Sequence, residues 1–126
     1  MRLNPIRFYP FFWGHSDERG EGEGLGFNLN LPLDRGTGDG DYMRTLKTGL
    51  ERIAAFGADV IIVALGLDAY EHDPLQGLAV TTGGFAAIGG AVAAAGPAVL
   101  LVQEGGYLCD GLGANLTSLL EGFQAA

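Results

Sequence analysis

The sequence predicts an α/β fold in which a parallel sheet is flanked by helices. Two short apolar runs, residues 60–65 and 98–102, contain no alternating polar positions. Such runs are typical of parallel strands that are covered on both faces. Segments with helical spacing of apolar residues alternate with them, which gives the order β-α-β-α-β-α over residues 28–126. This order predicts right-handed crossovers and helices on both faces of the sheet.

The composition indicates one domain or a piece of one. The 126 residues are 48% hydrophobic and 17% charged, so we expect a substantial core rather than disorder. A net charge of −8 argues against a nucleic-acid partner, because phosphates require a basic surface. The single cysteine, Cys109, fits a reducing cytoplasm. Pro5 and Pro10 interrupt the apolar start of the chain, so we expect neither a signal peptide nor a membrane span.

Residues 1–27 are expected to form an aromatic and glycine-rich loop region. Five aromatic residues lie within positions 8–13 without a helical or strand period, and they suit either a hydrophobic plug or the wall of a substrate channel. Residues 20–26 alternate glycine with other residues, among them two glutamates that would repel phosphate. A strand follows instead of a helix, so we reject a nucleotide-binding loop and expect an irregular one.

A short strand and a long helix are predicted next. Residues 28–33 alternate polar and apolar side chains, and Pro32 gives this strand edge character. Apolar residues then recur at helical spacing over residues 42–54. We expect Asp39 or Asp41 to cap this helix and Gly57 to end it in the left-handed conformation.

Two further helices are predicted on either side of the strand at residues 98–102. Thr81 and Thr82 are good N-cap candidates for the first, and Gly96 with Pro97 ends it. The last helix has an apolar stripe made of Leu112, Leu116, Leu119, Leu120 and Phe123. Together with the strand at residues 60–65, these segments complete the predicted unit at residues 28–126.

Polar residues follow both apolar strands directly. After residues 60–65 come Asp68 and a group formed by Glu71, His72 and Asp73, and residues 103–107 are polar and glycine-rich. In open α/β sheets, ligands bind beyond the carboxyl ends of the strands. Asp68 therefore stands where a catalytic or metal-binding carboxylate is expected.

Several motifs resemble one enzyme family. Gly66-Leu-Asp-Ala-Tyr-Glu-His-Asp-Pro-Leu75 and Glu104-Gly-Gly-Tyr107 resemble segments of the zinc-dependent deacetylases, which include histone deacetylases and acetylpolyamine amidohydrolases. Phe8-Tyr-Pro-Phe-Phe-Trp-Gly-His15 and Asn28-Leu-Asn-Leu-Pro-Leu33 are similar to further segments of these proteins. The resemblance runs from about Ile6 onward and leaves out Met1 to Asn4. It implies the C-terminal portion of an arginase/deacetylase-type α/β fold, a single partial domain at residues 1–126.

The resemblance also implies roles for individual residues. Asp68 is similar to the aspartate that binds zinc, and Tyr107 to the tyrosine that donates a hydrogen bond to the substrate carbonyl as it becomes an oxyanion. Phe11 and Phe12 resemble residues of the narrow substrate channel, to which Gly105 and Gly106 also belong. A structural monovalent cation near Phe27 is a further implication. The implied substrate is an acetylated polyamine or acetyl-lysine, and the implied cofactor is Zn²⁺.

The family motifs that complete the zinc site are absent from this sequence. A catalytic zinc needs three protein ligands, and the resemblance assigns the others to an Asp-x-His motif, with a separate His-His pair for acid-base chemistry. His15 and His72 stand in neither motif, and we expect His72 to be a loop residue beside the entrance. The chain is therefore expected to be inactive alone and to need a complementing N-terminal segment. The alternatives are a non-catalytic remnant that binds a partner, a homo-oligomer, or an α/β module for another small ligand.

Overall fold

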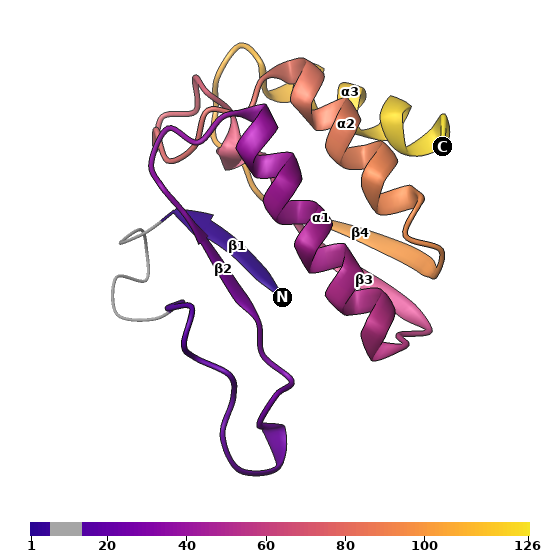
Figure 1. Cartoon of the computed structure of the whole chain (residues 1–126). Coiled ribbons are helices and arrows are strands. Elements are labelled where there is room, and N and C mark those ends of the chain that lie inside the picture. Colours follow the sequence, from indigo (N-terminus) through magenta and orange to yellow (C-terminus); the bar gives the residue numbers. More distant parts are fainter. Residues whose placement is uncertain (6–13) are drawn as a thin grey trace.

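The computed structural model describes residues 1–5 and 14–126, and its elements are arranged as Figure 1 shows. The strands are β1 (Arg2–Pro5), β2 (Asn30–Leu33), β3 (Val60–Gly66) and β4 (Ala98–Gly105). The helices are α1 (Asp39–Phe56), α2 (Thr82–Ala93) and α3 (Leu112–Gln124), and two 3₁₀ turns are η1 (Gly22–Gly24) and η2 (Leu67–Ala69). Strands and helices alternate from β2 to α3.

The strands form two parallel pairs. β1 pairs with β2 and β3 pairs with β4, and in the described part of the chain the two pairs are not joined into one sheet. Parallel pairing and flanking helices confirm the predicted fold class. β1 is an element that the sequence did not predict, because four residues ending in a proline contain too little pattern for a strand signal. The expected irregular region 1–27 therefore begins with a strand.

The core lies between the β3-β4 pair and the three helices. Its most deeply buried large side chains include Phe85 of α2, Leu119 of α3 and Leu67 of η2. Leu46 of α1 and Leu65 of β3 belong to the same cluster. In Figure 1, α2 and α3 lie side by side, and α1 crosses in front of the space between the two strand pairs. One face of the β3-β4 pair thus packs onto the helices.

The opposite face of the β3-β4 pair is exposed, which corrects the prediction that both faces are covered. Val60, Ile62, Leu100 and Val102 are 55%, 69%, 53% and 39% exposed, respectively. Val60 and Ile62 alternate with better buried residues in β3, and Ile62 pairs with Leu100 across the sheet. The apolar run forms the predicted strand, and both of its faces carry apolar residues. No described element of this chain covers the second face.

The helix ends follow local chemistry with one exception. Gly57 ends α1 with φ 75°, as expected, and the Thr81 hydroxyl accepts a hydrogen bond from the Gly84 N–H at 3.0 Å as the N-cap of α2. The predicted aspartate cap of α1 is wrong, because Gly38 is its N-cap. The Asp39 carboxylate instead accepts hydrogen bonds from the Thr81 N–H and hydroxyl, at 2.8 and 2.7 Å. Asp39 therefore ties the start of α1 to the start of α2.

Glycines let α2 and α3 approach each other closely. A Cβ atom on Gly89 of α2 would collide with the Leu119 carbonyl oxygen of α3, and one on Gly122 would collide with the Ala86 carbonyl oxygen. Such short approaches are accessible to glycine alone.

Among the described residues, no helix combines the length and apolar character needed to cross a bilayer.

Candidate functional site

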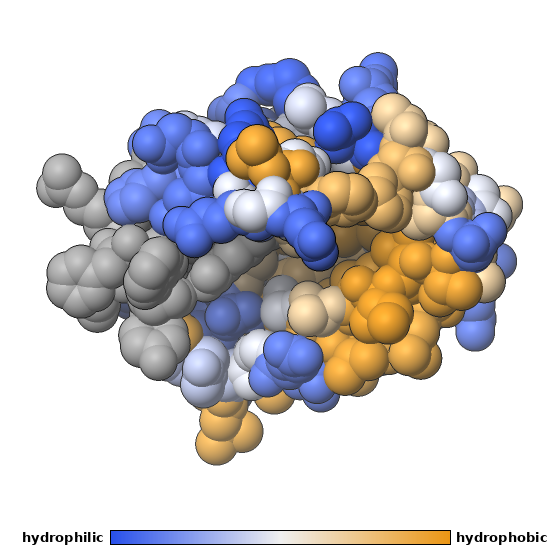
Figure 2. Space-filling model, turned by 90° about the horizontal axis from the view of Figure 1, so that it is seen from below, coloured by the Kyte–Doolittle hydropathy of each residue, from blue (hydrophilic) through white to orange (hydrophobic). Residues whose placement is uncertain are grey.

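A large cleft lies between the two strand pairs, and we call it the central cleft. Its volume is about 1090 Å³, and its walls include Leu3 on the β1 side and residues 61–66 of β3. Apolar residues of α1 and α2 form part of its lining, among them Leu46, Leu50, Phe85 and Ile88. Asp68, Gly105 and Tyr107 line it where β3 and β4 end. Figure 2 shows a hollow on this side of the molecule, beside a broad apolar surface.

Asp68 lies in a space that two glycines leave open. Its Oδ1 atom would be 2.5 Å from a Cβ on Gly66 and 2.6 Å from one on Gly105, so any side chain at either position would displace the carboxylate. Asp68 is thus held between the ends of β3 and β4. Burial raises the pKa of the Asp68 carboxyl above its usual 3.8, a backbone hydrogen bond within Asp68 opposes that shift, and the negative charge of Asp73 adds to it.

Asp73 fixes the backbone at Leu75 and at Tyr107. Asp73 is only 1% exposed. Oδ2 accepts a hydrogen bond from the Tyr107 N–H at 3.0 Å, and Oδ1 accepts one from the Leu75 N–H at 2.9 Å. The sequence showed Asp73 as one acid among several and did not reveal this role. The Asp-Pro-Leu sequence, which favours a local side-chain turn, was the available signal.

Tyr107 follows β4 and remains 49% exposed while it lines the central cleft. Gly106, with φ 119°, precedes it and lies against Leu67 and Leu112, where a Cβ would come within 2.9 Å of both. The left-handed backbone at Gly106 and the hydrogen bond from Tyr107 N–H to Asp73 together set the backbone position of Tyr107. Asp68 and Tyr107, predicted from the ends of two strands, therefore line the same cleft.

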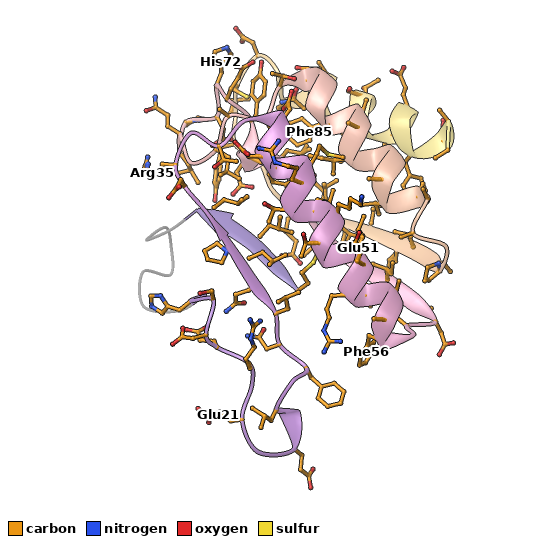
Figure 3. The ribbon with its side chains drawn as sticks, in the orientation of Figure 1. Glu21, Arg35, Glu51, Phe56, His72 and Phe85 are labelled. Carbon is orange, nitrogen blue, oxygen red and sulfur yellow. The ribbon has the colours of Figure 1, made fainter. Side chains whose placement is uncertain are left out.

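Other predicted site residues lie away from the central cleft or fall outside the residues that the structure describes. Phe11 and Phe12 fall within residues 6–13, which the structure does not describe. Phe27 packs edge-to-face on Phe56, with ring centroids 5.7 Å apart, at the opposite end of α1 from Tyr42 in the cleft. His72 is exposed and makes an edge-to-face contact with Tyr70. Figure 3 shows His72 and Phe56 at opposite ends of the molecule.

The described residues do not make a complete zinc site. No group of three His, Cys, Asp or Glu side chains comes together in residues 1–5 and 14–126, whereas a catalytic zinc takes three protein ligands. Asp68 offers one carboxylate with an open side toward the central cleft. Tyr107 offers a phenol, which can donate a hydrogen bond to a carbonyl oxygen.

Comparisons with known proteins agree on the family. The histone deacetylase domain matches residues 2–123, so the similarity also includes residues 2–4, which lie before the motifs that resemble this family. The acetylpolyamine amidohydrolases of Mycoplana ramosa and Burkholderia pseudomallei are 39% and 40% identical over 94% and 97% of this chain. The chain spans about a third of the length of these relatives, 35% and 36%.

Solved structures share the fold over almost the whole chain. The crystal structure of the acetylpolyamine aminohydrolase from Burkholderia pseudomallei matches 98% of this chain and 37% of its own, with 38% identity and a TM-score of 0.91. The histone deacetylase Clr3 matches 98% of this chain and 22% of its own, with 27% identity and a TM-score of 0.86. The chain belongs to the histone deacetylase family.

Proposed function

We propose that this chain supplies part of the active site of a deacetylase that hydrolyses the amide of acetylated amines, either acetylpolyamines or acetyl-lysine. The observation that carries the proposal is the convergence of Asp68 and Tyr107 on the central cleft. The similar proteins from Mycoplana ramosa and Burkholderia pseudomallei are named as acetylpolyamine amidohydrolases, which favours an acetylated polyamine. The complete protein would work in the cytoplasm, in keeping with the single cysteine.

Asp68 would be one ligand of a Zn²⁺ ion in the complete protein. Support comes from its open carboxylate at the end of β3 and from the glycines on both sides, which keep that space free. Burial, together with the negative charge of Asp73, raises the pKa of the Asp68 carboxyl, and a nearby cation would oppose that shift. The ion would supply Lewis-acid chemistry, with its further ligands coming from outside the described residues.

Tyr107 would donate a hydrogen bond to the substrate carbonyl oxygen as negative charge develops on it. A donor that is held in place before the reaction stabilises that charge without reorganisation. Asp73 holds the Tyr107 backbone by its N–H, and Gly106 supplies the turn that precedes it. The chain's own contribution to catalysis would therefore be the Tyr107 phenol and the Asp68 carboxylate, which line the same cleft.

A second candidate is a non-catalytic, partner-binding half of a split deacetylase. The exposed apolar face of the β3-β4 pair favours it, since isolated soluble proteins seldom leave such faces bare. In this case a complementing N-terminal segment or a second copy would bind, but no hydrolysis would follow.

Complementation separates the two candidates. The chain would be purified alone and also co-expressed with the portion of the Burkholderia pseudomallei enzyme outside the matched region. Hydrolysis of acetylpolyamine and acetyl-lysine reporters, together with bound zinc, would be measured for both. We expect no turnover by the chain alone and turnover by the complex, with Asp68→Ala removing most bound zinc. A stable complex that binds zinc but never turns over substrate would favour the partner-binding half, and turnover by the chain alone would contradict the proposal.

A further inference from the structure

The glycine-rich loop of residues 19–26 is closed by its own backbone and lies away from the central cleft. The Gly26 N–H donates a hydrogen bond to the Arg19 carbonyl oxygen at 2.7 Å, which joins the two ends of the loop. A Cβ atom on Gly20 would collide with the Gly24 carbonyl oxygen, so the chain within the loop is tightly folded. The structure describes all of the loop residues, and none of them lines the central cleft. The candidate site therefore leaves this loop without a role.

A second pocket lies between this loop and α1, and we call it the arginine pocket. It has a volume of about 330 Å³, at the lower end of the range of small-molecule pockets, about 300–1,000 Å³. Its lining combines two arginines, one amide and apolar or small residues, namely Arg19, Leu25, Gly26, Asn28, Leu29 and Arg52. The chain has 7 Lys and Arg residues and a net charge of −8, so two guanidinium groups at one pocket are a local excess of positive charge.

Both arginines are exposed, and neither forms an ion pair within the described residues 1–5 and 14–126. The ion pairs of that part of the chain join Arg44 to Asp41 and Lys47 to Glu51. Glu51 immediately precedes Arg52, but its carboxylate lies 3.9 Å from the Lys47 ammonium group. Within these ranges, the two guanidinium groups therefore keep their donors for an external anion.

The acidic side chains near the loop have other partners or face solvent. The Glu18 carboxylate accepts hydrogen bonds from the Gly14 N–H at 2.9 Å and from Asn30 Nδ2 at 2.8 Å. The two glutamates within the loop are exposed, and neither lines the arginine pocket. Figure 3 shows Glu21 on the side of the loop away from Phe56, which ends α1. The charge that an occupant of the pocket meets is therefore positive.

Recognition in this pocket would come from side chains, because the loop amides are already used. The N–H groups of four consecutive residues, Gly24 to Phe27, donate to carbonyl oxygens within residues 19–24. These amides cannot form the phosphate cradle of a nucleotide-binding loop, which agrees with the pattern of the sequence. A guanidinium group instead presents a planar fork of donors that matches the two oxygens of a carboxylate or a phosphate.

The remaining walls of the arginine pocket are largely apolar. Leu25 is 66% exposed, and Leu29, which lines the same pocket, is half-buried. Phe27 lies between them in the sequence and packs its ring on Phe56 of α1. An inorganic ion would leave the two leucines in water, whereas an organic anion would cover them. Cationic and apolar walls together therefore suit an anion with an apolar body.

We propose that the arginine pocket binds a small organic anion. Its carboxylate or phosphate group would lie between Arg19 and Arg52, and its apolar part would pack on Leu25 and Leu29. No described residue lines both this pocket and the central cleft. Occupancy of the arginine pocket would therefore need neither zinc nor the rest of a deacetylase, and it can be measured on this chain alone.

Titration with butyrate and with butyl phosphate tests the binding and distinguishes the two acidic groups. Amide NMR spectra of the labelled chain would follow residues 19–29 and Arg52. We expect saturable shifts there with at least one of the two anions, with a dissociation constant on the order of 1 mM or below. The neutral alcohol 1-butanol, and sodium chloride at equal ionic strength, should not produce them. Absence of saturable shifts with both anions, or the same shifts with sodium chloride, would overturn the proposal.

Matched glutamine variants locate the contact. Arg52→Gln should weaken binding at least about tenfold, because one charge-assisted contact is lost. Arg44→Gln removes the same charge from an exposed position of α1 that does not line the arginine pocket, so it should leave binding unchanged. Both positions are on the surface of the helix, and circular dichroism would check that each variant is folded. Equal weakening by the two variants would show attraction by overall charge alone and would overturn the proposal.

Discussion

Replacing Asp73 by asparagine should loosen the segment that holds Tyr107. The Asp73 carboxylate is nearly inaccessible and accepts two backbone hydrogen bonds, from Tyr107 N–H at 3.0 Å and from Leu75 N–H at 2.9 Å. Asparagine has one oxygen acceptor, so its NH₂ group would face one of the two N–H donors. Leaving one buried donor without a partner costs about 1–3 kcal/mol.

We expect Asp73→Asn to lower the stability of the whole chain and to loosen the backbone at Tyr107. Urea unfolding of Asp73→Asn should show a free energy of unfolding lower by about 1–3 kcal/mol. Amide exchange at Tyr107 should become faster, and in a complemented enzyme the turnover rate should fall because the phenol is less well positioned. Removing the Asp73 charge should also lower the pKa of Asp68, while burial continues to raise it.

Glu71→Gln is the matched control. Glu71 is exposed and lies two residues before Asp73, and the same loss of one negative charge there should leave stability and Tyr107 exchange unchanged. If Asp73→Asn leaves both the unfolding free energy and Tyr107 exchange as they are in the original chain, the two hydrogen bonds do not position Tyr107 and the reasoning fails.

Three further predictions concern pH and packing. Burial raises the folded-state pKa of Asp68 above 3.8, so ionising this carboxyl at pH 7 costs more in the native state than in the unfolded chain. In metal-free buffer Asp68→Asn should therefore be more stable than the original chain at pH 7, and the difference should close below pH 3.8. Equal stability of the two chains at pH 7 would contradict this. Burial, with a smaller effect of the Asp68 charge, raises the pKa of Tyr42 from 10.0 to about 12. Between these pH values the unfolded chain loses the phenol proton and the native state keeps it, so the free energy of unfolding should fall by on the order of 2 kcal/mol. Tyr42→Phe should flatten that fall when urea unfolding is measured at alkaline pH. Gly89→Ala should destabilise the chain by about 1–3 kcal/mol, because the new Cβ would meet the α3 backbone. Gly113→Ala, at a helical position with open space around it, should stabilise the chain by about 0.5–1 kcal/mol. Melting curves that rank the two variants the other way would refute the close packing of α2 on α3.

The helices could be predicted because their signals are local. Thr81 caps α2, Gly57 ends α1, and the apolar stripe of α3 repeats at helical spacing. The position of Asp68 after β3 followed from the apolar run before it. These features depend on residues within a few positions of each other, where sequence pattern and structure are closely linked.

The remaining features depend on contacts between distant segments. Asp39 bonds Thr81 rather than the start of its own helix, and Asp73 holds Tyr107 from 34 residues away. β1 is recognised as a strand through its pairing with β2, which lies far along the chain. The bare face of β3 could not be predicted, because an apolar run indicates that a face needs cover but not which part of a protein provides it.

The turnover rate of a complemented Tyr107→Phe enzyme tests most directly the claim that Asp68 and Tyr107 serve one site. Acetyl release would be measured with bound zinc determined on the same sample. The account predicts that zinc content is retained while turnover falls on the order of a hundred- to a thousandfold, the usual cost of losing one oxyanion donor. Turnover equal to that of the enzyme with Tyr107 intact would contradict it.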